Sequence, residues 1–224
     1  MILSIFYKEW IKTRRMVWFC LIASLGFLLY TQMRLSRVVE LQGAAHVWLI
    51  ILSKDVTFIE TLRFVPMAIG ILLGLAQYVP EMQHKRLKLT LHLPIHYNRI
   101  IMLMSGYGLA CLLAIFLIHY AWLWIYLHQL FATPITKHIL LTSLPWYIGG
   151  IAGYAFTVWM CVEPTWKYRV VHFLFAAISL HLLYISPYPC AYNRVLGILI
   201  LVSVFSIGYI ILSVSRFKRG EQDY

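Results

Sequence analysis

Histidine is the residue type in this sequence with the clearest capacity for ligand chemistry, because imidazole nitrogens bind haem iron and other metals. Of the nine histidines, four lie in or near long apolar runs: His119, His128, His172 and His181. The first two are nine residues apart, and so are the last two. At about 3.6 residues per turn, that spacing places the members of each pair on opposite faces of a helix. Histidines that bridge helices or lie at an interface are therefore favoured over a ligand pair on one helix. A pair formed between two helices stays open.

Other catalytic arrangements have no counterpart in the sequence. No Asp or Glu falls deep within an apolar run, so a buried pair of carboxylates for acid–base chemistry is not expected. Serine and glycine form neither a nucleophile elbow nor a phosphate-binding loop. Three cysteines lie in apolar runs and Cys190 stands alone in a short loop, a spacing that predicts neither disulfides nor a metal site. We expect a non-catalytic chain without a metal or cofactor of its own.

Composition predicts an all-α integral membrane protein. Of the 224 residues, 62% are hydrophobic and only 12% are charged. Soluble domains average about 45–50% apolar and about 25% charged residues. The net charge of +11 does not indicate nucleic-acid binding. Lys and Arg instead flank the apolar runs, where they set orientation and attract anionic headgroups.

The apolar runs predict six membrane spans. These are expected at about 16–33, 61–79, 100–130, 139–162, 170–186 and 195–214. The second span is predicted to end before Pro80. The third, at about 1.5 Å per residue, would measure roughly 46 Å, against a hydrocarbon core of about 30 Å. It must therefore tilt or project outward. An apolar patch at 47–52 is too short to cross and predicts a re-entrant or interfacial helix.

The basic residues predict the orientation of this single domain, which covers 1–224. Thirteen of the 19 Lys and Arg residues lie in the N-terminal region, the loop 81–99, the turn 163–169 and the C-terminal tail. The other six lie on the opposite side. Because cytoplasmic loops carry an excess of positive charge, both termini and the loop 81–99 are predicted to be cytoplasmic.

Two segments are predicted to have special packing roles. Residues 1–14 form an amphipathic pattern, with Phe6 and Trp10 on the apolar face. Lys8, Glu9 and Lys12 take the other face, which predicts an interfacial helix with its basic side toward headgroups. An ordinary positively charged flank is the alternative. In the fourth span, small residues would allow close helix approach: Gly149, Gly150 and Gly153.

The loop 81–99 is the longest polar stretch bounded by two spans, and it reads EMQHKRLKLTLHLPIHYNR. Alternating leucines within it are compatible with a strand, whereas Pro94 and the polar flanks equally support a short helix followed by a turn. A signal that only fixes topology needs neither this length nor a Leu-rich turn. A docking element for a partner protein is therefore favoured over a simple connector.

This loop resembles the one between spans two and three of ABC-2 type permeases, the membrane subunits of one group of ATP-driven exporters. The resemblance is carried by Glu81, by Leu87, and by residues 91–94 ending in Pro94, with Arg99 beyond. The family pattern runs from Glu-x-x-x-Gly-Thr-Leu-Glu through a Leu-rich turn to a Pro. In this chain Lys-Arg stands in place of Gly-Thr, and Lys88 in place of the second Glu.

The resemblance implies a permease domain in the bacterial inner membrane. Two ATPase subunits, which bind ATP and Mg²⁺, would act on a pair of permeases made of two copies or of one copy and a paralogue. Residues 1–14 would be the interfacial helix of that family. The coupling region would contain Glu81, Lys85, Arg86, Leu87, Leu93 and Pro94. The abundance of apolar residues favours an amphipathic or lipid-like cargo. The alternatives are a haem-binding subunit of a redox complex and a non-transporting anchor or scaffold.

Overall fold

The computed structural model describes residues 2–43, 47–51, 58–83, 86–91, 96–186, 188–192 and 194–219. The described chain is helical, with a short helical stretch over 47–51. Its named elements are α1 (Ile2–Gln42), the 3₁₀-helix η1 (Glu60–Leu62), α3 (Val65–Gln83), α4 (Arg86–Leu91), α5 (Tyr97–Leu130), α6 (Thr133–Val162), α7 (Trp166–Leu183) and α8 (Leu196–Arg219).

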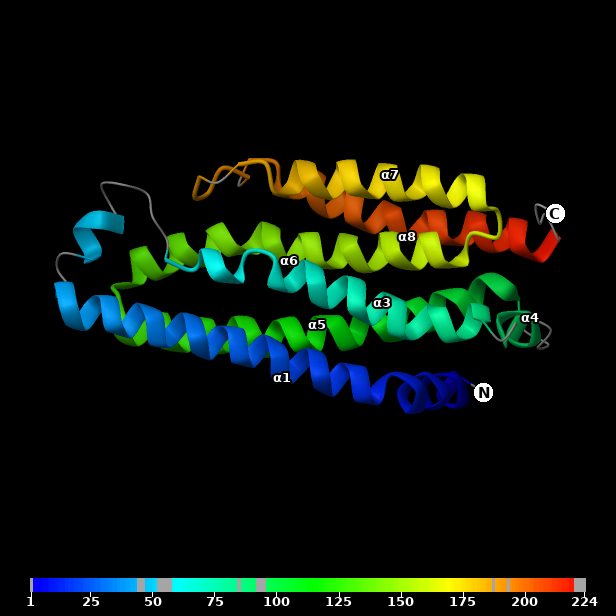
Figure 1. The fold of residues 1–224 in the computed structure, drawn as a ribbon, viewed down its shortest axis with the longest axis horizontal. Helices are drawn as coiled ribbons and strands as arrows, with labels where there is room; N and C mark the ends of the chain where they lie inside the picture. The colour runs from blue at the N-terminus through cyan, green and yellow to red at the C-terminus, as the bar shows by residue number, and fades with distance from the viewer. Residues whose placement is uncertain are drawn as a thin grey trace.

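The six long helices of the described residues run side by side along the long axis of the molecule, and α1 begins at the end of the bundle where α8 ends (Figure 1). Five segments of the described chain are long and apolar enough to cross a membrane: α1, η1 with α3, α5, α6 and α8. This all-helical architecture is consistent with an integral membrane protein. The fifth predicted span, 170–186, falls largely on α7, which lies alongside the others. Its crossing of the membrane and the cytoplasmic location of the termini stay predictions.

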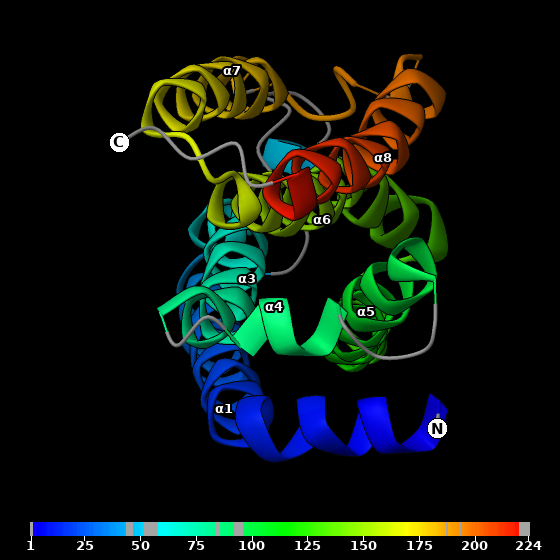
Figure 2. The same cartoon turned by 90° about the vertical axis from the view of Figure 1, so that its right-hand side faces the viewer.

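Helix α6 lies at the centre of the bundle, with α7 and α8 on one side and α3 and α5 on the other (Figure 2). Its glycines allow this close packing. A Cβ at Gly150 would lie 2.6 Å from the carbonyl oxygen of Pro66 in α3, and one at Gly149 would lie 2.6 Å from the hydroxyl of Tyr184. A Cβ at Gly153 would meet the backbone of Met67 at 3.4 Å. The small residues of the fourth predicted span are therefore packed inside the chain.

Helix α1 is longer than the predicted span 16–33 at both ends. The prediction stopped at Met33 because basic residues follow, but charged side chains do not end a helix. The helix ends at Gly43, which has φ +80° and donates its N–H to the carbonyl of Val39 at 2.9 Å. A glycine in this left-handed conformation is a common helix terminator. The buried stripe of α1 is rich in small and polar residues: Ile5, Glu9, Thr13, Cys20, Ser24, Leu28, Thr31 and Leu35.

The predicted interfacial segment is the first part of α1, and its turns lie across the end of the bundle (Figure 2). Its faces differ from the prediction. Glu9 is buried against the bundle and Lys12 is 13% exposed, whereas Trp10 on the predicted apolar face is exposed. Phe6 packs edge-on against Tyr107, with ring centroids 5.9 Å apart. The polar face packs against the bundle because Lys8 and Lys12 form ion pairs with Glu81 of α3.

The predicted loop 81–99 begins inside a helix. The second span was predicted to end before Pro80, but α3 continues through Pro80 to Gln83. Proline removes one backbone donor, a loss that a packed membrane helix tolerates where its neighbours stabilise it. Of the two structures that the sequence left open, the helix is present, since α4 covers Arg86–Leu91 and lies across the end of the bundle (Figure 2).

Candidate functional site

Two carboxylates meet at the end of the bundle where α1 begins. Glu9 in α1 and Glu81 in α3 are both buried. The ammonium nitrogen of Lys12 lies 2.8 Å from Oε2 of Glu9 and 3.0 Å from Oε1 of Glu81. One lysine therefore neutralises an acidic group on each of two helices and joins them.

Lys8 extends this charge network to α4. Its Nζ lies 3.0 Å from Oε1 of Glu81, and it donates a hydrogen bond to Oγ1 of Thr90 at 3.0 Å. Lys8 is 41% exposed, so its ion pair is weaker than that of Lys12. Through this side chain, α1 contacts both the end of α3 and the short helix α4.

Neutral side chains connect the network to the centre of the bundle. Gln77 in α3 donates to Oε2 of Glu9 at 3.0 Å and to the carbonyl of Met104 in α5 at 2.7 Å. Tyr154 in α6 donates to Oε1 of Gln77 at 2.7 Å. The network therefore connects α1, α3, α4, α5 and α6.

The charges of the network balance, with two lysines and two glutamates. Buried ions are expensive to desolvate, so each of them depends on its partner. Oε2 of Glu81 accepts no hydrogen bond from the described residues. The arrangement contains no activated nucleophile, and its acid and base groups are consumed in ion pairs. It is suited to holding helices together and to transmitting movement between them.

A third buried acid lies at the same end of the bundle, between α6 and α7. Glu163 accepts a hydrogen bond from Ser213 at 2.5 Å and one from Thr165 at 3.0 Å. Nη1 of Arg216 lies 3.6 Å from its Oε1, and Nδ1 of His172 lies 3.9 Å from its Oε2. This cluster ties the ends of α6, α7 and α8 together.

The four histidines in or near the spans have different surroundings. His119 is buried with Nδ1 2.5 Å from the hydroxyl of Tyr147, and His172 stacks on Trp159 with ring centroids 3.8 Å apart. His128 and His181 are exposed. The described residues contain no group of three or more His, Cys, Asp or Glu side chains placed to share a metal ion.

The residues predicted for coupling have different locations. Glu81 is buried in the charge network, and Leu87 is buried in α4. Arg86 is the first residue of α4. Lys85, Leu93 and Pro94 lie outside the described residues.

Sequence reasoning missed the lysine partners of Glu81. Glu9 and Lys12 are three residues apart, a spacing equally common on solvent-exposed helices. The available signal was their register with Ile5 and Thr13 along one helical face. The chain matches no protein-family model, no curated protein and no solved structure. The resemblance of the loop 81–99 therefore stays a prediction.

Proposed function

We propose that this chain is the membrane subunit of an ATP-driven exporter, acting with two copies of a separate ATPase that binds ATP and Mg²⁺. The observation that supports this proposal is the charge network that ties α4 to α1 and α3. The helix α4, the first turns of α1 and the end of α3 all lie at one end of the bundle (Figure 2). The basic residues of the sequence favour this end as the cytoplasmic one.

In this proposal α4 receives the movement of the ATPase, and the network transmits it. Displacement of α4 pulls on Lys8 through Thr90, and Lys8 holds Glu81 of α3. Lys12 holds the same carboxylate together with Glu9. Because separating Lys12 from Glu9 and Glu81 would leave unpaired charges in a low dielectric, α1 and α3 move as one unit. The partly exposed Lys8 joins α4 to that unit.

Glu81 then acts inside the permease, and exposed residues of α4 meet the ATPase. Leu89 is 74% exposed and is an apolar contact of the kind that a protein partner covers. Lys85, Arg86, Leu93 and Pro94 complete the proposed docking region. If this end of the bundle is cytoplasmic, as proposed, a protein partner there can cover the exposed leucine.

The proposed permease pair uses a surface other than the glycines of α6. Gly149, Gly150 and Gly153 are already packed within the chain. Helices α7 and α8 expose large apolar side chains, including Phe173 and Phe205, which are available to lipid or to a second permease. The cargo in this proposal is an amphipathic or lipid-like molecule.

A substitution in α4 with a matched control tests the proposal. Leu89→Ser removes the exposed apolar contact, and Leu41→Ser makes the same change at the far end of α1, where Leu41 is 79% exposed. In the complex purified from its own membranes, Leu89→Ser should release the ATPase or lower ATP hydrolysis several-fold. Leu41→Ser should leave both unchanged. Wild-type association and hydrolysis in both variants would contradict docking at α4.

A further inference from the structure

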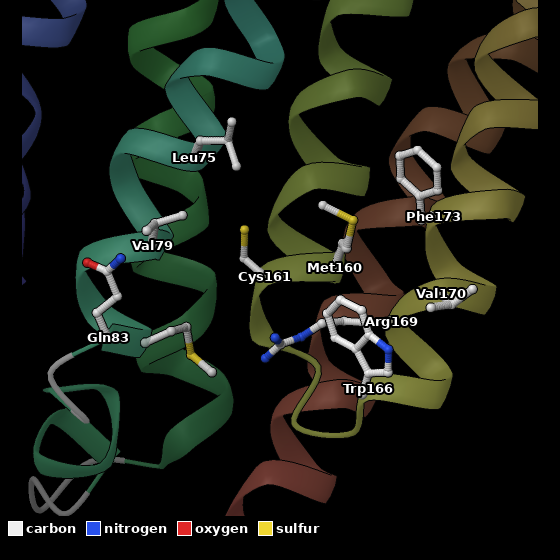
Figure 3. A pocket seen from close by; sticks show the side chains of 10 residues that line it. Leu75, Val79, Gln83, Met160, Cys161, Trp166, Arg169, Val170 and Phe173 are labelled. Atoms are coloured by element: carbon white, nitrogen blue, oxygen red, sulfur yellow. The ribbon is translucent and has the colours of Figure 1, made fainter.

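An apolar groove runs along one flank of the bundle, between α3, α6 and α7. It consists of two adjoining hollows of about 590 and 400 Å³, which share Met160 and Phe173 in their walls. Aliphatic, aromatic and sulfur-containing side chains form most of its lining, among them Leu75, Val79, Phe156 and Leu180. Figure 3 shows the end of the groove that lies nearest the start of α7.

Arg169 lies at that end. The guanidinium of Arg169 extends from α7 into the space between α3 and α6 (Figure 3). Its Nε donates a hydrogen bond to the carbonyl oxygen of Glu163 at 2.9 Å, which fixes the orientation of the side chain. A guanidinium carries five N–H donors, so the four on the two terminal nitrogens remain available to a ligand in the groove. Within the described part of the chain no carboxylate pairs with Arg169, since Glu163 directs its own oxygens to Arg216 and His172.

The groove extends along most of α7. Trp166 and His181, which line its two ends on this helix, are fifteen residues apart in sequence. That separation spans about 22 Å at roughly 1.5 Å per residue, more than half of a hydrocarbon core of about 30 Å, so the groove has room for an extended acyl chain. Trp166 lies beside Arg169 at the same end, where an aromatic ring is typical of the interface between headgroups and acyl chains.

We propose that this groove is a binding site for an anionic phospholipid of the surrounding membrane. An acyl chain lies along α3, α6 and α7, and the phosphate group pairs with the guanidinium of Arg169. A planar guanidinium suits a phosphate because it can donate two parallel hydrogen bonds. The occupant fills the apolar hollow and neutralises Arg169. This site does not depend on the proposed transport function.

The distribution of acidic residues favours a lipid over a second copy of the chain. At the Arg169 end of the bundle the described acidic residues are Glu9, Glu81 and Glu163, and all three are buried and paired. Glu40, near the end of α1, and Glu60, the first residue of η1, are exposed. The end of α1 lies at the opposite end of the bundle from its start (Figure 1). A second copy therefore offers Arg169 no exposed carboxylate among these residues, whereas an anionic headgroup supplies the missing charge.

Lipid retention measured by native mass spectrometry tests the headgroup contact. The full chain, in gentle detergent, is titrated with phosphatidylglycerol or with phosphatidylcholine of the same acyl chains. Arg169→Gln should weaken phosphatidylglycerol binding about tenfold or more, the loss expected for a charge-assisted hydrogen bond. Lys167→Gln is the matched control, since it removes one positive charge two residues away on an exposed position outside the groove, and it should change binding less than twofold. Phosphatidylcholine should bind more weakly than phosphatidylglycerol to the native protein.

A second pair of variants tests the acyl chain and leaves Arg169 intact. Ala177→Phe fills the groove, and Ile178→Phe adds a ring at the neighbouring exposed position. Only the first should lower phosphatidylglycerol retention. Equal retention of the two lipids, equal effects of the two charge variants, or unchanged retention in Ala177→Phe would overturn the proposal. So would a native dimer that Ala177→Phe converts to monomers, because the groove would then be an interface between copies.

Discussion

Replacing Lys12 with methionine removes the one charge that lies between two buried carboxylates. Methionine keeps the length and apolar stem of lysine, so the packing of α1 changes little. Glu9 would then keep only the neutral Gln77 as its partner, and Glu81 would keep only Lys8, which is 41% exposed. Glu9 would then be a buried carboxylate without a cationic partner among the described residues.

The magnitude follows from the burial of the three groups. Lys12 is 13% exposed, and both carboxylates are almost completely buried. Removing one partner of a buried ion pair costs about 3–5 kcal/mol, so Lys12→Met should lower the free energy of unfolding by that amount. Glu81→Gln should cost less, about 1.5–3 kcal/mol, because Lys12 keeps Glu9. Lys8→Met should cost at most about 1 kcal/mol, because its ion pair is partly exposed to solvent.

Equilibrium unfolding in mixed detergent micelles, followed by tryptophan fluorescence, measures these differences. Lys167→Met, which removes an exposed lysine from α7, is the control and should be close to neutral. Combining Lys12→Met with Glu9→Gln and Glu81→Gln should recover much of the lost stability, because no unpaired buried charge then remains. If Lys12→Met costs no more than Lys167→Met, the network does not hold the helices. If the triple variant recovers nothing, the loss reflects packing and not charge.

Three further perturbations test other parts of the structure. Gly150→Ala should destabilise the protein by about 1–3 kcal/mol, because the new Cβ would lie 2.6 Å from the carbonyl oxygen of Pro66. A Cβ at Gly106 meets open space, so Gly106→Ala should be neutral or stabilising. Equal effects of the two variants would contradict the α3–α6 packing. Glu163→Gln should lower the free energy of unfolding by about 1.5–3 kcal/mol, because the pairing with Arg216 is lost. Glu60 is exposed, so Glu60→Gln should leave the free energy of unfolding unchanged. An unchanged stability in Glu163→Gln would show that the Glu163 cluster does not stabilise the ends of α6, α7 and α8. Single cysteines replacing Lys88 and Lys218 should react with impermeant maleimide only from the cytoplasm, and one replacing Lys137 only from outside; external labelling at position 88 would reverse the orientation.

The helices of the bundle could be predicted from the sequence because their cause is local. Long apolar runs must form helices in a membrane, where every backbone polar group needs an internal partner. The third predicted run, 100–130, corresponds to α5, and 139–162 falls inside α6. The ends were less predictable. Pro80 and Arg34 are residues at which a membrane span is expected to end. Helices α3 and α1 nevertheless continue beyond them, because both helices pack against neighbouring helices.

The charge network could not be predicted because its members are distant in sequence. Lys12 and Glu81 are separated by 69 residues, and their contact requires that α1 bend across the end of the bundle. A sequence pattern places Lys12 on a polar face but cannot tell whether that face meets headgroups or a buried carboxylate. The register of Ile5, Glu9 and Thr13 with buried positions farther along α1 becomes informative only once the neighbouring helix is known.

The composition of the native complex tests the proposed function most directly. Native mass spectrometry of the chain, purified in gentle detergent from its own membranes, gives the mass and stoichiometry of everything that stays bound to it. An exporter subunit predicts two ATPase chains together with two permease chains, either two copies of this 26.2 kDa chain or one copy and a paralogue. The complex should also hydrolyse ATP. A stable assembly that contains this chain without any ATPase would contradict the account.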